Sequence, residues 1–461
     1  MPGLPSSTPP ATPPARRWTT GTLVYTTGGI ALLFCWLLFG DFAWAMRERS
    51  VGSMAQWYLK SIGVPNLVFG LLITSFPALL ALVLSPIISV KSDRHRGKWG
   101  RRIPFLLVTT PLAALGMIGV AVTPVAARWA HGHFPAQNEM MVSVVCFGVF
   151  WTLFELGAIA SQAVFGGLVN DVVPRPLLGR FYGLFRAISL IDGVIFNYWL
   201  IGKAPDHFTL MLSIIGVFYG GAFMLMCFKV KEGGYPPPPP LPPSAGNLAV
   251  RAATGVRGYF SECFLRKPYY ISVYALLTFG VLAAIPVTIY AIPYATSLEI
   301  PMDTYGKCMA ATYAISFGLS YFIGWLVDMF HPLRMAMVAL GLYACIAILG
   351  TLFATSQTVF IVLFVAHGVC GGCYITSASS IGQRLFPRDK FAQYASAGGM
   401  MNALVIMCLV PAVGLLIDST GGVYRWAFAC GGGLALTALF MGMLVYRQFI
   451  KYGGHGGYTA P

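Results

Sequence analysis

The stretch SVKSDRHRGKWGRRIPF, residues 89–105, is short and strongly basic, and long apolar runs flank it on both sides. The run before it covers about residues 64–90, and the run after it extends from residue 103 to about 125. An α-helix needs about 20 apolar residues to span a membrane. The stretch is therefore interpreted as a water-facing turn between two membrane-spanning helices.

The composition of the whole chain supports a membrane protein. Of its 461 residues, 57% are hydrophobic and only 10% are charged, and the mean hydropathy is +0.72. Soluble domains carry about 25% charged residues, so we expect this chain to be solvated by lipid. Its net charge of +15 would suit a nucleic-acid-binding protein, but the basic residues fall in short gaps between apolar runs, where charge sets topology. We expect a lipid bilayer and no nucleic acid as partner.

No motif indicates a metal, a cofactor or an enzyme activity. The ten cysteines lie mostly inside apolar runs, as expected of small packing residues. Cys370 and Cys373, preceded by His367, resemble a metal or redox motif, but a second pair of thiols is missing. The sequence contains no phosphate-binding loop and no catalytic triad, so we expect neither ATP-driven transport nor catalysis.

Twelve apolar runs are long enough to cross a membrane, and each is expected to form a helix. They cover approximately residues 22–45, 65–90, 103–124, 140–168, 180–202, 208–230, 269–295, 306–329, 334–355, 359–382, 391–417 and 424–447. The longest gap follows the sixth run and is rich in proline. This predicts an all-α membrane protein with two pseudo-symmetric six-helix bundles, the layout of the major facilitator fold.

These runs divide the chain into five regions. We expect a disordered cytoplasmic tail over residues 1–20, an N-terminal bundle over 21–230, a Pro-rich cytoplasmic linker over 231–267, a C-terminal bundle over 268–448 and a cytoplasmic tail over 449–461. Within the linker, the prolines at 236–240 favour extended chain. A short amphipathic helix is expected near Tyr259 and Phe260.

The distribution of Lys and Arg predicts the orientation, because cytoplasmic loops carry most of the positive charge. Most of the 30 Lys and Arg residues fall in gaps on the side of both termini. The residues on the other side are Arg47, Arg49, Lys60, Arg128, Lys203, Lys307 and Arg425. We therefore expect a multi-pass protein of the plasma membrane with both termini in the cytoplasm. The membrane is expected to be a cell inner membrane, and the protein is expected to be a monomer.

The basic loop and the fourth span resemble the sucrose–proton symporters. The loop pattern of that group, shared with the wider glycoside–pentoside–hexuronide cation symporters, is matched by Pro86, Asp93, Arg94, Gly100, Arg101, Arg102, Pro104 and Phe105. Glu155, Gln162 and Asp171 stand where the sucrose carriers have an intramembrane Asp, a Gln and the Asp that closes the fourth helix. The resemblance covers about residues 60–200. It implies a major facilitator transporter that carries a sugar or glycoside together with a cation.

One departure from the wider family concerns the coupling ion. Ser85 and Ala81 occupy the positions of two Asp residues in the sodium-coupled melibiose-type carriers. A Na⁺ site needs several hard oxygen ligands, so this difference favours protons. In the second half of the chain, Asp328 stands in the loop equivalent to the one that carries Asp93.

Ionisable side chains inside the spans are the candidate functional groups, because they are costly in lipid and usually serve a function. We predict that Glu155 on the fourth span is the main protonation site. Arg186 on the fifth span would be its charge partner and a donor to the sugar. Asp192 on the same span would share the proton or bind sugar hydroxyls. The alternative is that these groups form structural ion pairs.

Asp41 and His367 are further candidates. Asp41 is expected near the outer end of the first span, where pairing with Arg47 or Arg49 is the alternative to a coupling role. His367 on the tenth span titrates in the physiological range, and a packed structural histidine is its alternative.

The basic loop is also predicted to form a cytoplasmic gate. Asp93 would face a neighbouring helix N-terminus, where the helix dipole favours an anion, while Arg101 and Arg102 would pair with Asp171. With Arg94, Gly100 and Asp328, these residues would latch the outward-open state and release it when the halves rock. The alternative is that the stretch only sets the topology.

These predictions combine into a secondary active transporter that carries a sugar or glycoside with protons by alternating access. One alternative keeps the fold and changes the cargo to a lysolipid or drug. Another alternative is a non-transporting membrane sensor or assembly factor, and the Pro-rich linker is the feature of the sequence that favours it.

Overall fold

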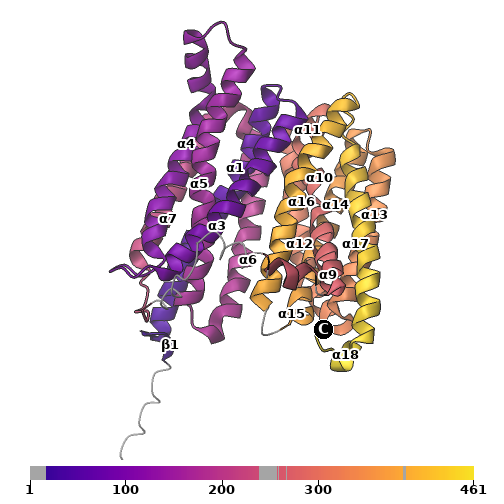
Figure 1. Ribbon diagram of the computed structural model, residues 1–461. Helices are drawn as coiled ribbons and strands as arrows, with labels where there is room; N and C mark the ends of the chain where they lie inside the picture. The colour runs from indigo at the N-terminus through magenta and orange to yellow at the C-terminus, as the bar shows by residue number, and fades with distance from the viewer. Residues whose placement is uncertain (1–16, 238–256, 258, 266, 388–390) are drawn as a thin grey trace, which may run out of the picture.

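Long apolar helices dominate the structure, a computed structural model that describes residues 17–237, 257, 259–265, 267–387 and 391–461. The helices lie side by side in two groups, one from each half of the chain (Figure 1). This architecture confirms the predicted all-helical membrane fold with two bundles.

The N-terminal group contains a β-hairpin, long helices, π-helical stretches (η1, η3) and 3-10 turns (η2, η4). Its elements are β1 (Trp18–Thr20), β2 (Leu23–Tyr25), α1 (Thr27–Ser61), α2 (Asn66–Gly70), η1 (Leu71–Ser75), α3 (Phe76–Arg94), α4 (Ile103–His133), α5 (Glu139–Val172), η2 (Arg175–Leu177), α6 (Leu178–Ile195), η3 (Phe196–Leu200), η4 (Ile201–Lys203) and α7 (Ala204–Lys229).

The C-terminal group has the same character. Its elements are η5 (Ser261–Leu265), α9 (Pro268–Leu282), α10 (Ile285–Ile289), α11 (Ala291–Ser297), α12 (Met302–Phe330), α13 (Pro332–Phe353), α14 (Gln357–Ala378), α15 (Ile381–Leu385), α16 (Phe391–Ser419), α17 (Trp426–Lys451) and α18 (Gly454–Gly457).

Among the described residues, eleven helical runs are long and apolar enough to span a membrane. One of them, from Phe181 to Lys229, contains two of the twelve predicted spans, because η3 and η4 keep the chain helical between α6 and α7. Each predicted span therefore corresponds to a helical segment.

The first span is much longer than the predicted residues 22–45, since α1 continues to Ser61. The prediction ended the helix before Arg47 and Arg49, because charges usually mark the end of a span. In the structure, the Arg47 guanidinium packs against aromatic rings that include Trp44 and Tyr219. The Arg49 guanidinium bonds to hydroxyl groups of neighbouring helices. Both side chains are accommodated inside the bundle, so the helix does not end there.

The disordered tail predicted for residues 1–20 is wrong at its C-terminal end. The strands β1 and β2 pair antiparallel around Gly21, whose positive φ of 54° suits a tight turn. The backbone N–H of Gly234 donates to the Thr22 hydroxyl at 2.7 Å, so the start of the linker holds this hairpin. Residues 1–16 lie outside the described part of the chain.

The linker is described only at its two ends. Residues 231–237 are extended and contact the N-terminal group. The helix predicted near Tyr259 and Phe260 is present, since both residues are helical and η5 follows them. Most of the Pro-rich centre, residues 238–256, lies outside the described residues.

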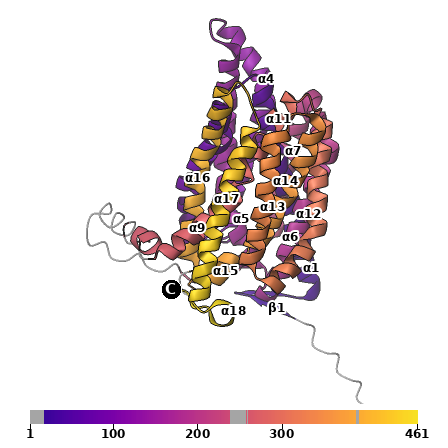
Figure 2. The same ribbon diagram turned by 90° about the vertical axis from the view of Figure 1, so that its right-hand side faces the viewer.

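Residues 449–461, the predicted cytoplasmic tail, are docked on the C-terminal group. The hydroxyl of Tyr458 donates to the Leu385 carbonyl at 2.8 Å, and that of Tyr270 donates to the Pro461 carbonyl at 3.1 Å. The hairpin and α18 lie at the same end of the bundle, which we call the terminal face (Figures 1 and 2). The opposite end, with α11 and the turn between α4 and α5, is the distal face.

The two groups pack together near the distal face and separate toward the terminal face. A single hydrophobic core joins the N-terminal group to distal residues of the C-terminal group, including Tyr290, Val410 and Phe428. Residues of the C-terminal group nearer the terminal face, such as Leu333 and Phe449, form a second core of their own. Between the groups, α2 and η1 pack against α16, and η3 and η4 against α12.

Asp418 at the end of α16 closes the distal face by capping α2 of the other group. Its carboxylate accepts hydrogen bonds from the backbone N–H groups of Asn66 and Leu67, at 3.1 and 2.9 Å, and from the Asn66 side chain at 2.6 Å. A carboxylate at a helix N-terminus satisfies N–H groups that have no partner inside the helix. Beside it, the buried Tyr290 hydroxyl donates to the Val410 carbonyl at 2.8 Å.

We predict that Asp418→Ala loosens this closure, because the freed N–H groups lose charge-assisted partners at a cost of about 1–3 kcal/mol. Spin labels on cysteines at Ser61 and Ser419, with exposed native cysteines replaced, should report more long distances in a double electron–electron resonance experiment. Asp206→Ala, which removes an exposed carboxylate from a surface cavity that Ser61 also lines, is the control and should leave the distances unchanged. An unchanged distribution in Asp418→Ala would show that the cap does not hold the face shut.

Candidate functional site

Two cavities lie inside the protein, one between the groups and one lined by the N-terminal group except for Ile289. The first, of about 260 Å³, we call the arginine cavity because Arg49 and Arg186 line it. The N-terminal group contributes α1 and α6, and the C-terminal group contributes α12, α14 and the residues around α10. The second, of about 270 Å³, we call the glutamate cavity because Glu48 and Glu155 line it, together with Arg47.

Helix α1 separates the two cavities. Successive residues of a helix are about 100° apart around its axis, so neighbours in sequence point in different directions. Arg47 and Glu48 line the glutamate cavity, whereas Arg49 lines the arginine cavity. The stretch that was predicted to lie outside the membrane is thus central to the interior of the protein.

In the arginine cavity, Arg49 connects the two groups. Its guanidinium donates to the Tyr313 hydroxyl on α12 at 3.0 Å and to the Ser189 hydroxyl on α6 at 3.2 Å. It also lies over the Tyr313 ring, 4.8 Å from the centroid, a cation–π arrangement. Arg49 is therefore held by neutral groups from both halves.

His367 forms part of the wall of the arginine cavity and is almost fully buried, with 2% of its surface exposed. Its Nδ1 lies 2.8 Å from the Tyr343 hydroxyl oxygen and its Nε2 lies 3.4 Å from that of Thr288. Both ring nitrogens have neutral partners, the environment expected of a packed histidine. Because His367 lies on the cavity wall, its role in substrate binding stays a prediction.

In the glutamate cavity, Glu155 faces Arg47, which corrects the predicted pairing with Arg186. Both line this cavity, and the guanidinium is the charged group that acts on the carboxylate electrostatically. Arg186 lies in the other cavity. The Arg47 guanidinium itself lies 4.0 Å from the centre of the Trp44 ring and 5.1 Å from that of Tyr219.

Asp41 and Asp192 are buried inside the N-terminal group. Their exposed fractions are 1% and 0%, and neither carboxyl oxygen of either residue has a hydrogen-bond partner. The placement of Asp41 near the outer surface is therefore wrong, because α1 extends 20 residues beyond it. Neither residue lines one of the two cavities.

The interior charges do not form ion pairs with one another. The ion pairs found in the described residues are Arg101–Asp171, Arg102–Asp171, Arg102–Asp93 and Lys307–Asp303. None of them involves the three interior arginines or the interior carboxyls. The structural ion pairs considered as an alternative for Glu155, Arg186 and Asp192 are thus not seen.

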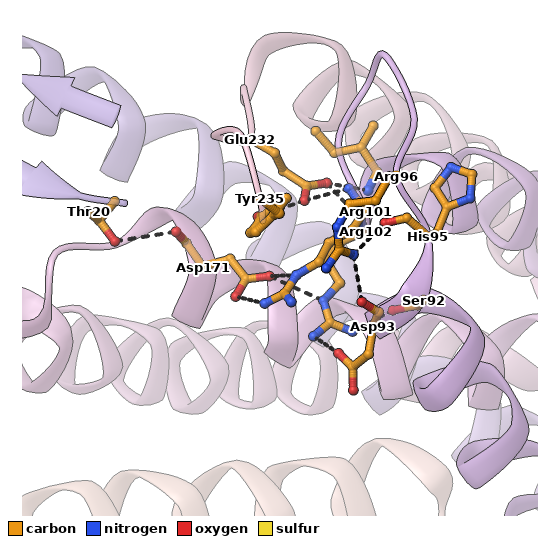
Figure 3. A network of polar contacts seen from close by, with 11 residues as sticks. Thr20, Ser92, Asp93, His95, Arg96, Arg101, Arg102, Asp171, Glu232 and Tyr235 are labelled. Atoms are coloured by element: carbon orange, nitrogen blue, oxygen red, sulfur yellow. Dashed lines mark hydrogen bonds and ion pairs between the residues drawn. The ribbon is translucent and has the colours of Figure 1, made fainter. Parts of the chain in front are cut away.

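At the terminal face, the basic loop forms a dense polar cluster (Figure 3). Arg101 pairs with Asp171 in a bidentate contact, at 2.8 and 2.5 Å, and Arg102 donates to the same carboxylate at 3.2 Å. Arg102 also contacts Ser92 and Asp93. The bond to Asp171 raises the pKa of Arg101, so the guanidinium stays charged. The predicted pairing of both arginines with Asp171 is present.

Glu232, at the start of the linker, is the centre of this cluster and was missed by the sequence analysis. Its carboxylate accepts from the backbone N–H groups of Arg101, Arg102 and Ile103, at 2.9, 2.8 and 2.6 Å (Figure 3). It therefore caps α4, whereas the sequence analysis expected Asp93 as the carboxylate at a neighbouring helix N-terminus. The sequence offers one signal for this role. Glu232 lies before the prolines, where the chain is still close to the end of α7.

Gly100 makes this contact possible. It has a positive φ of 96°, and a Cβ at this position would lie 2.7 Å from Oε1 of Glu232. Tyr235 covers the other side of the cap, since its hydroxyl donates to Glu232 at 2.9 Å and its ring lies 4.3 Å from the Arg101 guanidinium. Burial raises the pKa of Tyr235, so the hydroxyl remains a donor.

The cluster joins segments of the N-terminal group and the linker, and its described contacts include none with the C-terminal group. It is intact while the distal face is closed. The predicted latch between the halves is therefore not supported. Arg94 ends α3 and Asp328 lies near the end of α12, and the gating role of both stays a prediction.

We predict that Glu232→Ala lowers the thermal unfolding temperature by several degrees, because three backbone N–H groups lose a charged acceptor, at about 1–3 kcal/mol. Thermal unfolding of the detergent-solubilised protein is the measurement. Glu139→Ala removes an exposed acid from the first turn of α5 and should shift the temperature much less. Equal shifts in the two variants would contradict the cap.

Comparisons with known proteins agree with this architecture. The sequence model described as Major Facilitator Superfamily matches residues 274–450. Protein PucC of Cereibacter sphaeroides is 24% identical over 435 residues, which cover 87% of this chain and 88% of the relative.

Two solved transporters share the fold. A bacterial homologue of the human lysosomal transporter Spinster, inward-facing and occupied, superposes with a TM-score of 0.67 at 13% identity, covering 91% of this chain and 97% of the other. The xylose transporter XylE from E. coli, inward-open, gives 0.58 at 14% identity, covering 89% and 94%.

These findings confirm the predicted fold and leave the superfamily and its glycoside branch as proposals for the chain as a whole. The sequence match covers residues 274–450, and the shared fold covers about nine-tenths of the chain. The C-terminal part of this chain is therefore similar to the Major Facilitator Superfamily, and the chain shares the fold of solved membrane transporters.

Proposed function

We propose that this protein is a proton-coupled secondary transporter that carries a sugar or glycoside by alternating access. The observation that carries the proposal is the arginine cavity between two halves that are closed against each other at one face only, together with the glutamate cavity of the N-terminal half. Alternating access requires a central site that faces one side at a time.

The orientation follows from charge. The terminal face carries the basic loop with its Lys and Arg residues, and positively charged loops face the cytoplasm. With the termini in the cytoplasm, the state described here would be inward-facing, because its closed end is the distal face. This orientation and a plasma-membrane location belong to the proposal.

The glutamate cavity offers the chemistry that a sugar needs. Glu48, Gln56, Glu155 and Gln162 present carboxylates and amides that can bind hydroxyl groups, and Trp151 adds an aromatic surface. Ligand sites combine such apolar surfaces with a few polar groups. Glu155 and Gln162 are also the positions at which the sequence resembles the sucrose–proton symporters.

Proton coupling is supported by the unpaired carboxyls. An ionised carboxylate without hydrogen-bond partners costs several kcal/mol in a water-poor interior. Asp41 and Asp192 are in this situation, and Glu155 lines the glutamate cavity together with Glu48. A proton bound to Glu155 would remove its charge and lower the cost of moving the two halves past each other.

Exposed aromatic residues favour a second candidate cargo. Phe317, Tyr321, Phe322 and Trp325 on α12 are all at least half exposed, and these residues lie on the part of the helix toward the terminal face. An apolar surface beside the central cavities would suit a lysolipid or drug.

We predict that Glu155→Gln abolishes accumulation of substrate against its gradient, because glutamine cannot carry the proton, while downhill exchange continues. Uptake of labelled sugars and glycosides into proteoliposomes, with and without an imposed pH gradient, is the measurement. Glu139→Gln, an exposed acid on the same helix, is the control and should transport normally.

Undiminished accumulation in Glu155→Gln would contradict its coupling role. Uptake of a lysolipid but of no sugar would favour the second candidate. No flux of any substrate would favour the non-transporting alternative.

A further inference from the structure

Three arginines in the interior of the protein have no carboxylate partner within ion-pair distance. They are Arg47, Arg49 and Arg186, and the ion pairs of the described residues include none of them. Charges inside a membrane protein are usually paired. Arg47 is largely enclosed by aromatic rings, so the two that line the arginine cavity need a different explanation.

Arg186 differs from the other two in being exposed. Among the described residues it has no hydrogen-bond or ion-pair partner, although its side chain is exposed to the arginine cavity. Arg49 lines the same cavity and is close enough to repel it. Two like charges facing one cavity are unfavourable unless an anion enters between them.

The other walls of the cavity add neutral donors. Thr288, Ser316 and Tyr313 contribute hydroxyl groups. Gly368 and Gly372 on α14 let Thr312 and Ser316 of α12 pack closely against that helix. This combination of two guanidinium forks and several hydroxyls is typical of carboxylate or phosphate recognition.

We propose that the arginine cavity binds an anionic group, a carboxylate or a phosphate, of the transported substrate, with Arg186 and Arg49 as its donors. This inference rests on the proposed function and narrows it to acidic substrates. The hydroxyl-bearing part of such a substrate would extend past α1 toward the glutamate cavity. If a proton entered together with the anion, the net charge of the protein interior would be nearly the same with and without bound substrate.

A carboxylate could come from a sugar acid and a phosphate from a lysolipid headgroup, so the experiment compares two matched pairs of probes. Thermal stabilisation of the purified full-length protein is titrated with D-glucuronate against D-glucose, and with lysophosphatidate against the monoacylglycerol of the same chain. The anionic member of at least one pair should bind more tightly than its neutral partner. The pair that shows the difference identifies the source of the anion.

The variant Arg186→Gln should weaken binding of that anion roughly ten- to hundredfold, the effect of losing a charge-assisted hydrogen bond, with no change for the neutral probe. Because Arg186 holds no other side chain in place, this variant should fold normally. Arg128→Gln, an exposed arginine bonded to its own helix, should bind like the wild type. Arg49→Gln should also weaken binding of the anion. This variant tests Arg49 as the second donor.

Equal stabilisation by the charged and neutral members of both pairs would overturn the proposal. The proposal would also be overturned if neither anion stabilised the protein. An undiminished preference for the anion in Arg186→Gln would overturn it as well. Binding does not depend on proton coupling, so accumulation retained in Glu155→Gln would refute the coupling step and leave the anion site standing.

Discussion

The organisation of this protein depends on one constraint, that an ionised side chain in a bilayer must be compensated by nearby groups. At the terminal face, Arg101 and Arg102 pair with Asp171, and Glu232 caps the start of α4. In the interior no ion pair is found among the described residues, and aromatic rings contact Arg47 while hydroxyls bond Arg49. The paired charges stabilise one end of the bundle, and the unpaired ones are left available for ligands and protons.

The terminal cluster ties several segments of the N-terminal group together. It joins the loop between α3 and α4, the end of α5, the N-terminal hairpin and the first linker residues. Because its described contacts stay within this group and the linker, the cluster does not oppose rocking of the two halves. It instead ensures that the loop and the linker move with the N-terminal helices.

Movement between the halves depends on the contacts that cross between them. At the distal face, Asp418 caps α2 of the other group and Tyr290 bonds to α16 within a shared hydrophobic core. Closer to the middle, Arg49 contacts both α6 and α12. An anion that engages Arg49 and Arg186 would compete for the same guanidinium donors, which gives a physical route from substrate binding to the relative position of the halves.

The sequence by itself determined the membrane class, the number of spans, the division into two halves and the pairing of Arg101 and Arg102 with Asp171, because these follow from apolar run length and from charges close to a turn. Tertiary structure alone decided the extent of α1, since whether Arg47 and Arg49 can be buried depends on rings and hydroxyls from distant segments. It also replaced Asp93 by Glu232 as the cap of α4 and Arg186 by Arg47 as the neighbour of Glu155. Those choices depend on which helices lie side by side, and periodicity and composition carry no information about that.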